Sequence, residues 1–420
     1  MYQFTRHKNG VTIATAEMPH MSSVSIGIWV AVGGRYEPAQ FSGVSHFIEH
    51  MLFKGTRRRN SKEISQSVEG IGGYLNAFTT EETTCFYSKA CHDKIDDLWD
   101  VLADMFLNST FDEGELNKER NVIKEELAMY LDQPHHHVQE LLNETLWPDQ
   151  PLGRSLTGTE ATLDVLRRKE LIQYRDENYV TQGTLVVAAG RLKHDEIVKA
   201  VSPLVGRFPK GRRPQFQPAA VEQQKPRVRL FTKNVEQTQV ALGIRACSRH
   251  DERRFALRLL NTVLGENMSS RLFQTIREEH GLAYSICSNI AFYDDVGVLN
   301  ISAGLETEQL EKALRLIVKE LRGCARLSPT AGELKRARDY VLGQIDLSLE
   351  NTENQMMWLG EQLIGYGKIF TPEQVKQRLR DVTASEVKRA ARDFFQPDRF
   401  TMALVSSLQD SRHLLPLIKL

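Results

Sequence analysis

Two distant segments of this chain begin a charged amphipathic helix with the same three residues, and this repeat constrains the fold more than any other feature. Phe111–Leu127 (FDEGELNKERNVIKEEL) and Leu327–Ile345 (LSPTAGELKRARDYVLGQI) each place Gly-Glu-Leu after an acidic or Ser/Pro-containing turn. Helix starts often resemble one another, so the triplet alone leaves a chance match open. A duplicated chain would build the same architecture twice.

A stretch that contains proline, glycine and many polar residues divides the 420-residue chain near its middle. Residues Val205–Arg229 have little periodicity, which indicates a linker. The chain is also too long for one ordinary hydrophobic core. Together with the repeated helix start, these observations favour duplication. They predict a first half at 1–212, a linker at 213–227 and a second half at 228–420.

Each half begins with alternating apolar segments, a pattern typical of half-buried strands. We expect strands at Val11–Ala16, Val24–Val32, Val228–Thr232, Thr238–Ile244, Ala283–Tyr293 and Val296–Ala303. Long helical patterns follow the first strands in both halves. The sequence therefore predicts an α+β fold of two homologous halves, each a mostly antiparallel sheet covered by helices.

The charge balance argues against two classes of partner. Lys plus Arg and Asp plus Glu both total 54, so the formal net charge is zero. Nucleic acids and anionic membranes favour a basic surface, so we expect neither as a partner. The N-terminal residues lack a signal or transit pattern, and the apolar run Val24–Val32 is too short to cross a bilayer. Five scattered cysteines indicate reduced thiols, and we expect a cytoplasmic protein.

The segment His46-Phe47-Ile48-Glu49-His50 carries the most informative chemistry in the chain. At 3.6 residues per turn, positions 46, 49 and 50 share one face of a helix. Two imidazoles there can bind one zinc ion, and the carboxylate beside them can take a proton from water. The order H-x-x-E-H is a metallopeptidase signature, although five residues can also match by chance on an ordinary helix.

Catalytic zinc usually takes three protein ligands, so one more must come from elsewhere. On the helix expected at 115–130, Glu119 and Glu126 lie about 20° apart on the helical wheel, whereas Glu125 falls on the opposite face. The two carboxylates lie within an apolar stripe made of Leu116, Val122, Ile123, Leu127 and Tyr130. A buried carboxylate needs an ion-pair partner or a metal. We predict that Glu126 is the third ligand and that Glu119 orients a histidine.

The second half carries no equivalent of this motif. Alignment of the Gly-Glu-Leu triplets places Ala337 opposite Glu119 and Gln344 opposite Glu126. The corresponding helix at Phe255–Leu264 is apolar. The adjacent histidines at 135–137 cannot all face one metal from regular structure, so we expect a loop that leads into a helix there. If the chain has one metal site, that site belongs to the first half.

Three segments of the first half resemble the M16 (pitrilysin/insulinase) family of zinc peptidases, and the two-half length is similar to the branch containing mitochondrial processing peptidase and its bacterial relatives. The segments are Gly33–Thr56 (GGRYEPAQFSGVSHFIEHMLFKGT), Gly72–Thr84 (GGYLNAFTTEETT) and Glu119–Glu126 (ERNVIKEE). The resemblance implies the LuxS/M16 peptidase-like metalloenzyme fold. It also implies that His46, His50 and Glu126 bind one Zn²⁺ per chain, that Glu49 is the general base and that Glu119 is a further functional carboxylate.

The resemblance also indicates where a peptide would bind. The segment Gly73–Phe78 (GYLNAF) is similar to an edge strand that pairs with extended substrates in the family, which makes Asn76 and Ala77 candidate substrate-binding residues. A turn asparagine beside a small residue is the alternative. Glu82 is a candidate for an outer carboxylate of the site, or a residue of a solvated strand end.

In the second half, the stretch Ser269–Ser288 (SSRLFQTIREEHGLAYSICS) resembles the part of the family that carries an Arg/Tyr pair. The matching residues are Arg277 and Tyr284. Arg277 would bind peptide carbonyl groups, and Tyr284 would contact the substrate and donate a hydrogen bond to the oxyanion. A structural Arg–Glu pair and a packed strand tyrosine are the alternatives.

The predicted function is that of a zinc-dependent endopeptidase acting on unstructured peptides. The resemblance implies two chains that face each other around a chamber. A homodimer is the simplest arrangement, because this chain carries both the zinc motif and the Arg/Tyr pair; a heterodimer with a related M16 chain stays open. The competing class is a non-catalytic peptide-binding or assembly subunit. The cleavage preference, the physiological substrate and the choice between precursor processing and general peptide degradation also stay open.

Overall fold

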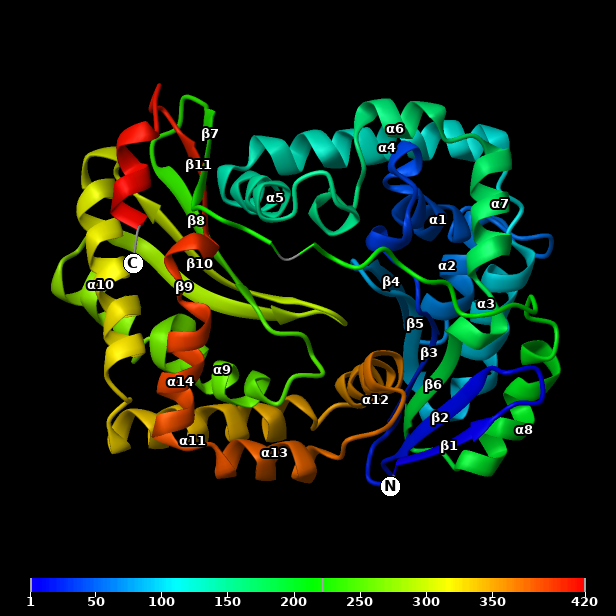
Figure 1. The fold of residues 1–420 in the computed structure, drawn as a ribbon. Helices are drawn as coiled ribbons and strands as arrows, with labels where there is room; N and C mark the ends of the chain where they lie inside the picture. Colours follow the sequence, from blue (N-terminus) through cyan, green and yellow to red (C-terminus); the bar gives the residue numbers. More distant parts are fainter. Residues whose placement is uncertain (1, 221, 419–420) are drawn as a thin grey trace. The chain divides into compact units, whose positions relative to one another are not determined.

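The structure, a computed structural model, describes residues 2–220 and 222–418. These residues form two compact units, and each unit is an α+β body with one sheet (Figure 1). The first unit contains the described residues of 1–127, 154–217 and 347–369, and the second contains those of 128–153, 218–346 and 370–420. The predicted fold class is confirmed, but neither unit is one continuous half of the chain.

The first unit is built on a six-stranded sheet in the order β1-β2-β6-β3-β5-β4. The pair β2–β6 is parallel, and every other neighbouring pair is antiparallel. The strands are β1 (Tyr2–Arg6), β2 (Thr12–Glu17), β3 (Ser23–Val30), β4 (Tyr74–Thr79), β5 (Thr84–Cys91) and β6 (Thr184–Gly190). Strand β3 is buried along nearly its whole length, because helices cover both faces of the sheet.

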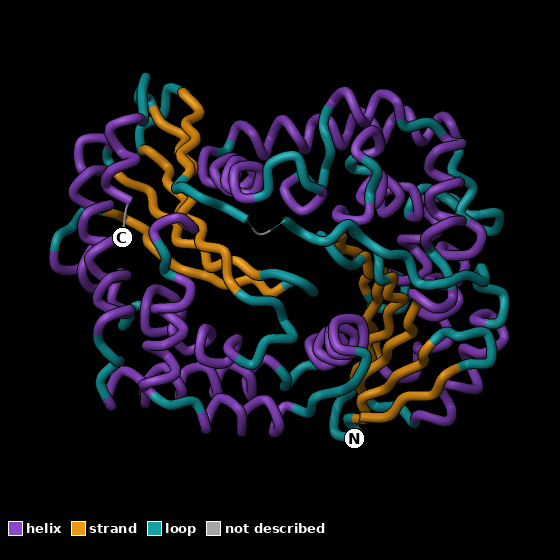
Figure 2. The backbone as a smooth tube through the Cα atoms, in the orientation of Figure 1, coloured by secondary structure: helices purple, strands orange, loops and turns teal. Residues whose placement is uncertain are grey.

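The second unit contains a five-stranded sheet in the order β7-β11-β8-β10-β9. Its one parallel pair is β7–β11, and the other neighbours are antiparallel. The strands are β7 (Arg227–Thr232), β8 (Thr238–Ala246), β9 (Ala283–Phe292), β10 (Gly297–Leu305) and β11 (Phe400–Ser406). Figure 2 draws the strands of both sheets in orange.

The two sheets follow one plan. The series β2-β6-β3-β5-β4 corresponds strand for strand to β7-β11-β8-β10-β9, including the position of the parallel pair. Helices α4 (Glu113–Asp132) and α11 (Ala331–Ser348) both carry Gly-Glu-Leu in their first turn. The duplication inferred from the sequence therefore accounts for the architecture of both units.

The remaining helices cover these sheets. Helices of the first part of the chain are α1 (Val44–Leu52), α2 (Ser61–Glu69), α3 (Ile95–Asn108), α5 (Pro134–Leu146), α6 (Glu160–Val165), α7 (Arg168–Asn178) and α8 (His194–Val205). Those of the second part are α9 (Arg253–Asn261), α10 (Leu310–Arg326), α12 (Thr352–Tyr366), α13 (Pro372–Asp381) and α14 (Ala384–Phe394), with π-helical turns at Thr262–Glu266 and Phe273–Glu279. Short 3₁₀ turns lie at Gly34–Tyr36, Ala39–Phe41, His92–Lys94, Pro151–Gly153, Thr181–Gly183, Thr307–Gln309, Pro397–Arg399 and Arg412–Ile418.

Each repeat contributes one helix to the unit of the other repeat. Helix α12, orange in Figure 1, packs on β2, β3 and β6 of the first sheet, and α5 packs on β7, β8 and β11 of the second. The division at 213–227 predicted from the sequence therefore differs from the spatial units in segments 128–153 and 347–369. Each sheet has two apolar faces, and the second face of each is buried by a helix from outside its own repeat.

Small residues let α12 approach the first sheet closely. The packed residues of this layer include Ala14, Ala16, Trp29, Ala31, Ala189, Met356, Leu359 and Leu363. A Cβ atom at Gly360 would lie 2.4 Å from Cε2 of Trp29, and Trp29 itself is only 1% exposed. The hydroxyl of Thr352 also bonds Ser25 in the buried interface, at 2.9 Å. Close packing against Trp29 therefore depends on glycine at position 360.

Gly360→Ala should destabilise the protein. The added methyl group has no room, and overpacking of this kind costs up to about 3 kcal/mol, which exceeds the ~1 kcal/mol that alanine gains over glycine inside a helix. We expect the free energy of unfolding to fall by about 2 kcal/mol, measured by denaturant titration with circular dichroism. Gly343→Ala on α11 is the matched control, because apart from the neighbouring backbone of its own helix no described atom lies within 4 Å of the added Cβ. Equal stability of both variants would contradict this packing.

The segment 135–137 lies in the first turn of α5, so the predicted loop is wrong. Pro134 begins that helix, where a missing N–H costs nothing. Within the residues that the structure describes, none of the helices combines the length and the apolar character needed to cross a bilayer.

Candidate metal centre

Helix α1 carries the H-x-x-E-H residues, and a buried carboxylate fixes its first turn. The chain enters α1 through Gly43, whose φ of 92° is readily adopted only by glycine. Glu37 accepts hydrogen bonds from Gly43 N at 2.7 Å and from Ser45 N at 2.8 Å. Such N–H groups have no partner inside the helix. Burial raises the pKa of Glu37 to about 7, although these hydrogen bonds act in the opposite direction.

The side chains of His46 and His50 meet that of Glu126 from α4. The Nε2 atoms of His46 and His50 lie 3.8 Å and 3.7 Å from Oε2 of Glu126. One potential ligand atom from each of the three residues lies within 4.8 Å of the others. These are the three residues that the sequence analysis named as metal ligands, and the fold brings them together within the first unit.

Helix α4 presents Glu119 and Glu126 toward α1, as the helical wheel required. Glu119 is 5% exposed, whereas Glu125 is exposed to solvent. One residue of the expected apolar stripe was misplaced: Val122 is 49% exposed, while Leu116 and Ile123 are buried. The wheel gives the direction of a side chain, but Val122 lies at the edge of the stripe where no other element covers it.

A chain of contacts holds His50 in place. Glu119 Oε2 lies 3.0 Å from Nδ1 of His50, and Glu119 Oε1 pairs with Nζ of Lys54 at 2.8 Å. The contact leaves Nε2 of His50 directed toward Glu126 and fixes the orientation of the ring. Glu119 was predicted from the sequence, whereas Lys54 was not, although Lys54 lies four residues after His50 and so is close to the same face of the helix.

His46 is kept in its neutral, metal-binding form mainly by burial. The low polarity around it and the neighbouring His50 lower the pKa of His46 to about 4. Its imidazole is therefore neutral at physiological pH, and a neutral imidazole is the form that binds a metal. The rings of the two histidines lie with their centroids 4.7 Å apart.

Glu49, the predicted base, is bonded to the edge strand of the first sheet. The hydroxyl of Thr79, the last residue of β4, donates to Glu49 Oε2 at 2.5 Å. Burial raises the pKa of Glu49; the bond from Thr79 and the nearby His50 oppose the rise, and Glu126 adds to it. Thr79 was not predicted from the sequence. It lies two residues after Ala77, so Thr79 and Ala77 share one face of the strand.

The donor set fits a zinc ion. Zinc binds histidine nitrogen and carboxylate oxygen at about 2.0–2.2 Å in a tetrahedron, which separates neighbouring ligand atoms by roughly 3.3–3.6 Å. The distances of 3.7 Å and 3.8 Å from Glu126 to the two imidazoles need only a small inward movement. Two imidazoles and one carboxylate leave a fourth position for water or substrate.

The candidate peptide strand β4 lies at one end of the first sheet and pairs with β5 on one side. The Asn76 side chain is exposed, and its Oδ1 accepts a hydrogen bond from the backbone N–H of Ala77 at 2.8 Å. Asn76 belongs to this strand, so the turn asparagine considered as its alternative is not what the structure has. Glu82 follows the strand and forms a buried ion pair with Arg35 at 2.6 Å.

Arg277 and Tyr284 belong to the second unit. The Arg277 guanidinium lies 5.3 Å from the centre of the Tyr284 ring and 4.8 Å from that of Phe273. Tyr284 is 79% exposed on strand β9, so the alternative of a packed tyrosine does not hold. Arg277 Nε also lies 3.7 Å from Oε1 of Glu278. The contacts with substrate predicted for Arg277 and Tyr284 stay predictions.

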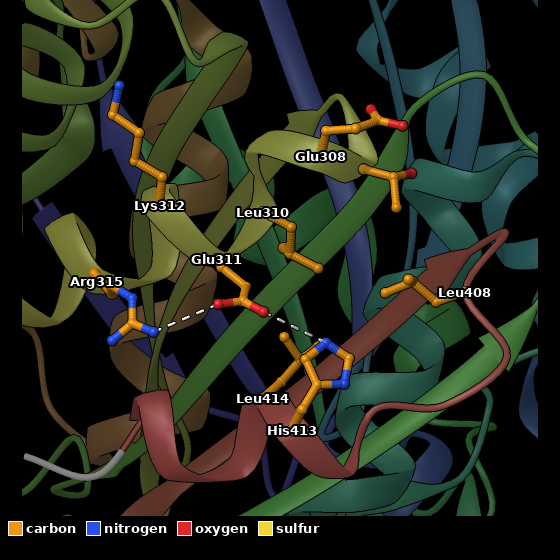
Figure 3. Close-up of a pocket in the computed structure, with 9 residues that line it drawn as sticks. Glu308, Leu310, Glu311, Lys312, Arg315, Leu408, His413 and Leu414 are labelled. Carbon is orange, nitrogen blue, oxygen red and sulfur yellow. Dashed lines mark hydrogen bonds and ion pairs between the residues drawn. The ribbon is translucent and has the colours of Figure 1, made fainter.

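A surface pocket of about 560 Å³ lies elsewhere in the second unit (Figure 3). Its lining residues are Thr307, Glu308, Leu310, Glu311, Lys312, Arg315, Leu408, His413 and Leu414. Glu311 contacts Arg315 at 3.4 Å and His413 at 3.9 Å, as the dashed lines of Figure 3 mark. Glu311 is thus paired with basic groups, and among the described residues only His46, His50 and Glu126 form a group that could hold a metal ion.

Comparison with known proteins identifies the family. Residues 12–160 match the family model described as insulinase (peptidase family M16), and residues 166–341 match that of the peptidase M16 inactive domain. A relative described as the uncharacterized zinc protease YmxG of Bacillus subtilis is 37% identical over 405 residues, which cover 95% of this chain and 97% of that protein. A relative from Mycobacterium tuberculosis H37Rv, also described as an uncharacterized zinc protease, is 36% identical over 386 residues, or 91% of this chain and 88% of the relative.

Solved structures agree in fold. A protease from Helicobacter pylori superposes with a TM-score of 0.89 at 21% identity, covering 97% of this chain and 99% of that one. The peptidase M16 inactive domain from Pseudomonas fluorescens gives 0.90 at 18% identity, covering 97% and 98%. The family models and the relatives place this chain in the class of zinc metallopeptidases, and the solved structures have the same fold. This chain belongs to peptidase family M16, as the sequence motifs predicted.

Proposed function

We propose that the protein is a zinc-dependent endopeptidase that hydrolyses extended, unstructured peptides. The observation that carries the proposal is the convergence of His46, His50 and Glu126 within 4.8 Å, with Glu49 on the same helix face. The donor set suits zinc, and the adjoining carboxylate is the group that hydrolysis requires. The zinc proteases similar to this chain support the same reaction class.

Each residue of the site would have a separate role in peptide hydrolysis. Bound zinc would polarise the scissile carbonyl and make a water molecule acidic enough to ionise near neutral pH. Glu49 would take the proton of that water and return it to the leaving nitrogen. Glu119 would keep the His50 ring oriented, and Tyr284 would donate a hydrogen bond to the oxyanion.

The peptide would add to the free edge of β4 as a further strand. Main-chain hydrogen bonds to a sheet edge recognise any extended peptide, with little demand on its side chains. Asn76 and Ala77 would contribute to that edge, and Arg277 would bind peptide carbonyl groups. Most backbone N–H and C=O groups of a folded protein are already paired, so unstructured peptides are the expected substrates.

We further propose that two chains assemble around a chamber, as a homodimer or with a related M16 chain, and that the protein acts in the cytoplasm. The family resemblance supports the assembly, because this chain carries both the metal residues and the Arg277–Tyr284 pair. The proposal includes one zinc ion per chain, and the single set of converging ligands among the described residues supports it.

A mixed peptide library tests the proposal. Purified protein with one equivalent of zinc should cleave the library internally, and a chelator should stop cleavage until zinc is restored. Mass spectrometry of the products reads the activity, its metal dependence, the length limit and the cleavage preference in one assay. Chelator-resistant cleavage, or a protein that binds zinc and peptides without cleaving them, would overturn it; the second result would identify a non-catalytic subunit.

A further inference from the structure

The direction of the backbone in β4 determines which of its residues face an added peptide. In an antiparallel pair, successive residues direct their N–H and C=O groups alternately toward and away from the partner strand. Thr80 N donates to Thr83 O at 2.8 Å, so the main-chain N–H and C=O groups of Thr80 point toward β5. Those of its neighbour Thr79 point away from β5. Two residues earlier, the N–H of Ala77 bonds the side chain of Asn76, which agrees with the same alternation.

The main-chain groups of Thr79 therefore point toward the free edge of the sheet, where β4 is the terminal strand. Its side chain has a different partner, because the hydroxyl donates to Oε2 of Glu49 at 2.5 Å. Thr79 is thus placed to contact the peptide backbone through its own backbone and the base through its hydroxyl. Among the described residues of β4, only Thr79 forms a hydrogen bond with Glu49.

The turn that follows Thr79 is fixed from the opposite side. The backbone N–H groups of Gly34 and Arg35 donate to Thr80 O at 3.0 Å and to Glu81 O at 2.9 Å. A Cβ atom at Gly33 would lie 2.1 Å from Thr80 O, so only glycine permits this approach. The buried Arg35–Glu82 ion pair adds a further tie at 2.6 Å. The end of β4 is therefore held rigidly where Thr79 meets the base.

We propose that Thr79 is a positioning residue that sets the register between the bound peptide and Glu49. The proposal rests on the proposed function, since it assumes that peptides add to β4 and that Glu49 is the base. A peptide paired with Thr79 has its backbone at a fixed offset from the Glu49 carboxylate. The hydroxyl keeps that carboxylate from rotating away. The same residue therefore fixes the position of the peptide backbone and that of the carboxylate that transfers the proton.

The test compares Thr79→Val with Thr79→Ser. Valine keeps the shape of threonine but removes the hydroxyl, whereas serine keeps the hydroxyl and removes the methyl group. Outer contacts of this kind are worth about 10–100-fold in activity. We expect Thr79→Val to lower kcat by about that factor with KM within about twofold of wild type, and Thr79→Ser to stay within about threefold for kcat.

A second measurement does not depend on turnover. A peptide hydroxamate binds zinc through two oxygens and needs the neighbouring carboxylate to accept its proton, so its affinity reports the orientation of Glu49. Thr79→Val should weaken binding of this inhibitor by about 10–100-fold, and Thr79→Ser should not. Zinc content and thermal stability, measured in parallel, should match those of the wild type in both variants.

The outcomes separate the two proposals. Wild-type kinetics and wild-type hydroxamate affinity in Thr79→Val would overturn the role of Thr79, as would equal impairment in Thr79→Ser or a parallel loss of zinc. Absence of hydrolysis by the zinc-loaded wild type would instead overturn the proposed function. In that case the hydroxamate comparison still decides whether the hydroxyl of Thr79 orients Glu49.

Discussion

Glu49→Gln should abolish peptide hydrolysis while the protein keeps its zinc. Glutamine has nearly the same shape and can still accept a hydrogen bond from the Thr79 hydroxyl, which lies 2.5 Å from Oε2 of Glu49 in the wild type. It cannot take a proton from water at neutral pH, and general base catalysis of this kind contributes about 10²–10⁴-fold. We therefore expect kcat/KM to fall by at least about 10²-fold.

The measurement is the initial rate of cleavage of a fluorogenic peptide, chosen from the products of the library digestion. Zinc content by atomic absorption and the melting temperature serve as controls, and both should equal those of the wild type. Hydrolysis at the wild-type rate in a pure sample would contradict the role of Glu49. Loss of zinc in the variant would show that Glu49 supports the metal site instead.

Glu126→Gln should lose zinc affinity, and its neighbour Glu125→Gln should not. Zinc binding by a full set of ligands is worth roughly 10–16 kcal/mol, so one ligand contributes about 3 kcal/mol, or about 100-fold in Kd. Glu126 Oε2 lies between the two imidazoles at 3.8 Å and 3.7 Å. Glu125 is exposed on the opposite face of α4 and carries the same charge.

Competition with a chromogenic chelator measures both affinities under one set of conditions. Because each variant removes one negative charge from adjacent positions, a general electrostatic effect would weaken both by similar amounts. A selective loss in Glu126→Gln supports direct coordination. Equal Kd values for Glu126→Gln and the wild type would contradict the ligand assignment and direct attention to Glu119, the other carboxylate in contact with His50.

The sequence predicted those parts of the site that depend on regular local geometry. The wheel separated Glu126 from Glu125 because a helix of 3.6 residues per turn fixes the direction of each side chain. The same reasoning misplaced Val122, which is 49% exposed, because direction does not say whether another element covers the residue. The positions of the strands followed from alternation: the strand expected at Thr238–Ile244 is β8, which begins at the same residue and ends two residues later, at Ala246.

Contacts between remote segments could not be predicted in the same way. The hydrogen bond from Thr79 to Glu49 joins residues on a strand and a helix whose spacing depends on the packed sheet. The exchange of α5 and α12 is a clearer case, because an amphipathic helix carries no local signal for the sheet that it will cover. The division at 213–227 rested on the linker and the repeated helix start, and so it assigned both helices to their own repeats.

The helix exchange has a consequence for the synthesis of the chain. The last strand of the first sheet, β6, ends at Gly190, but the helix that covers one face of that sheet begins at Thr352. Since a nascent chain emerges from its N-terminus, the apolar layer around Trp29 stays open until α12 leaves the ribosome. The metal-bearing unit is therefore completed near the end of translation, and a truncated chain that ends before α12 should expose this layer to chaperones and to aggregation.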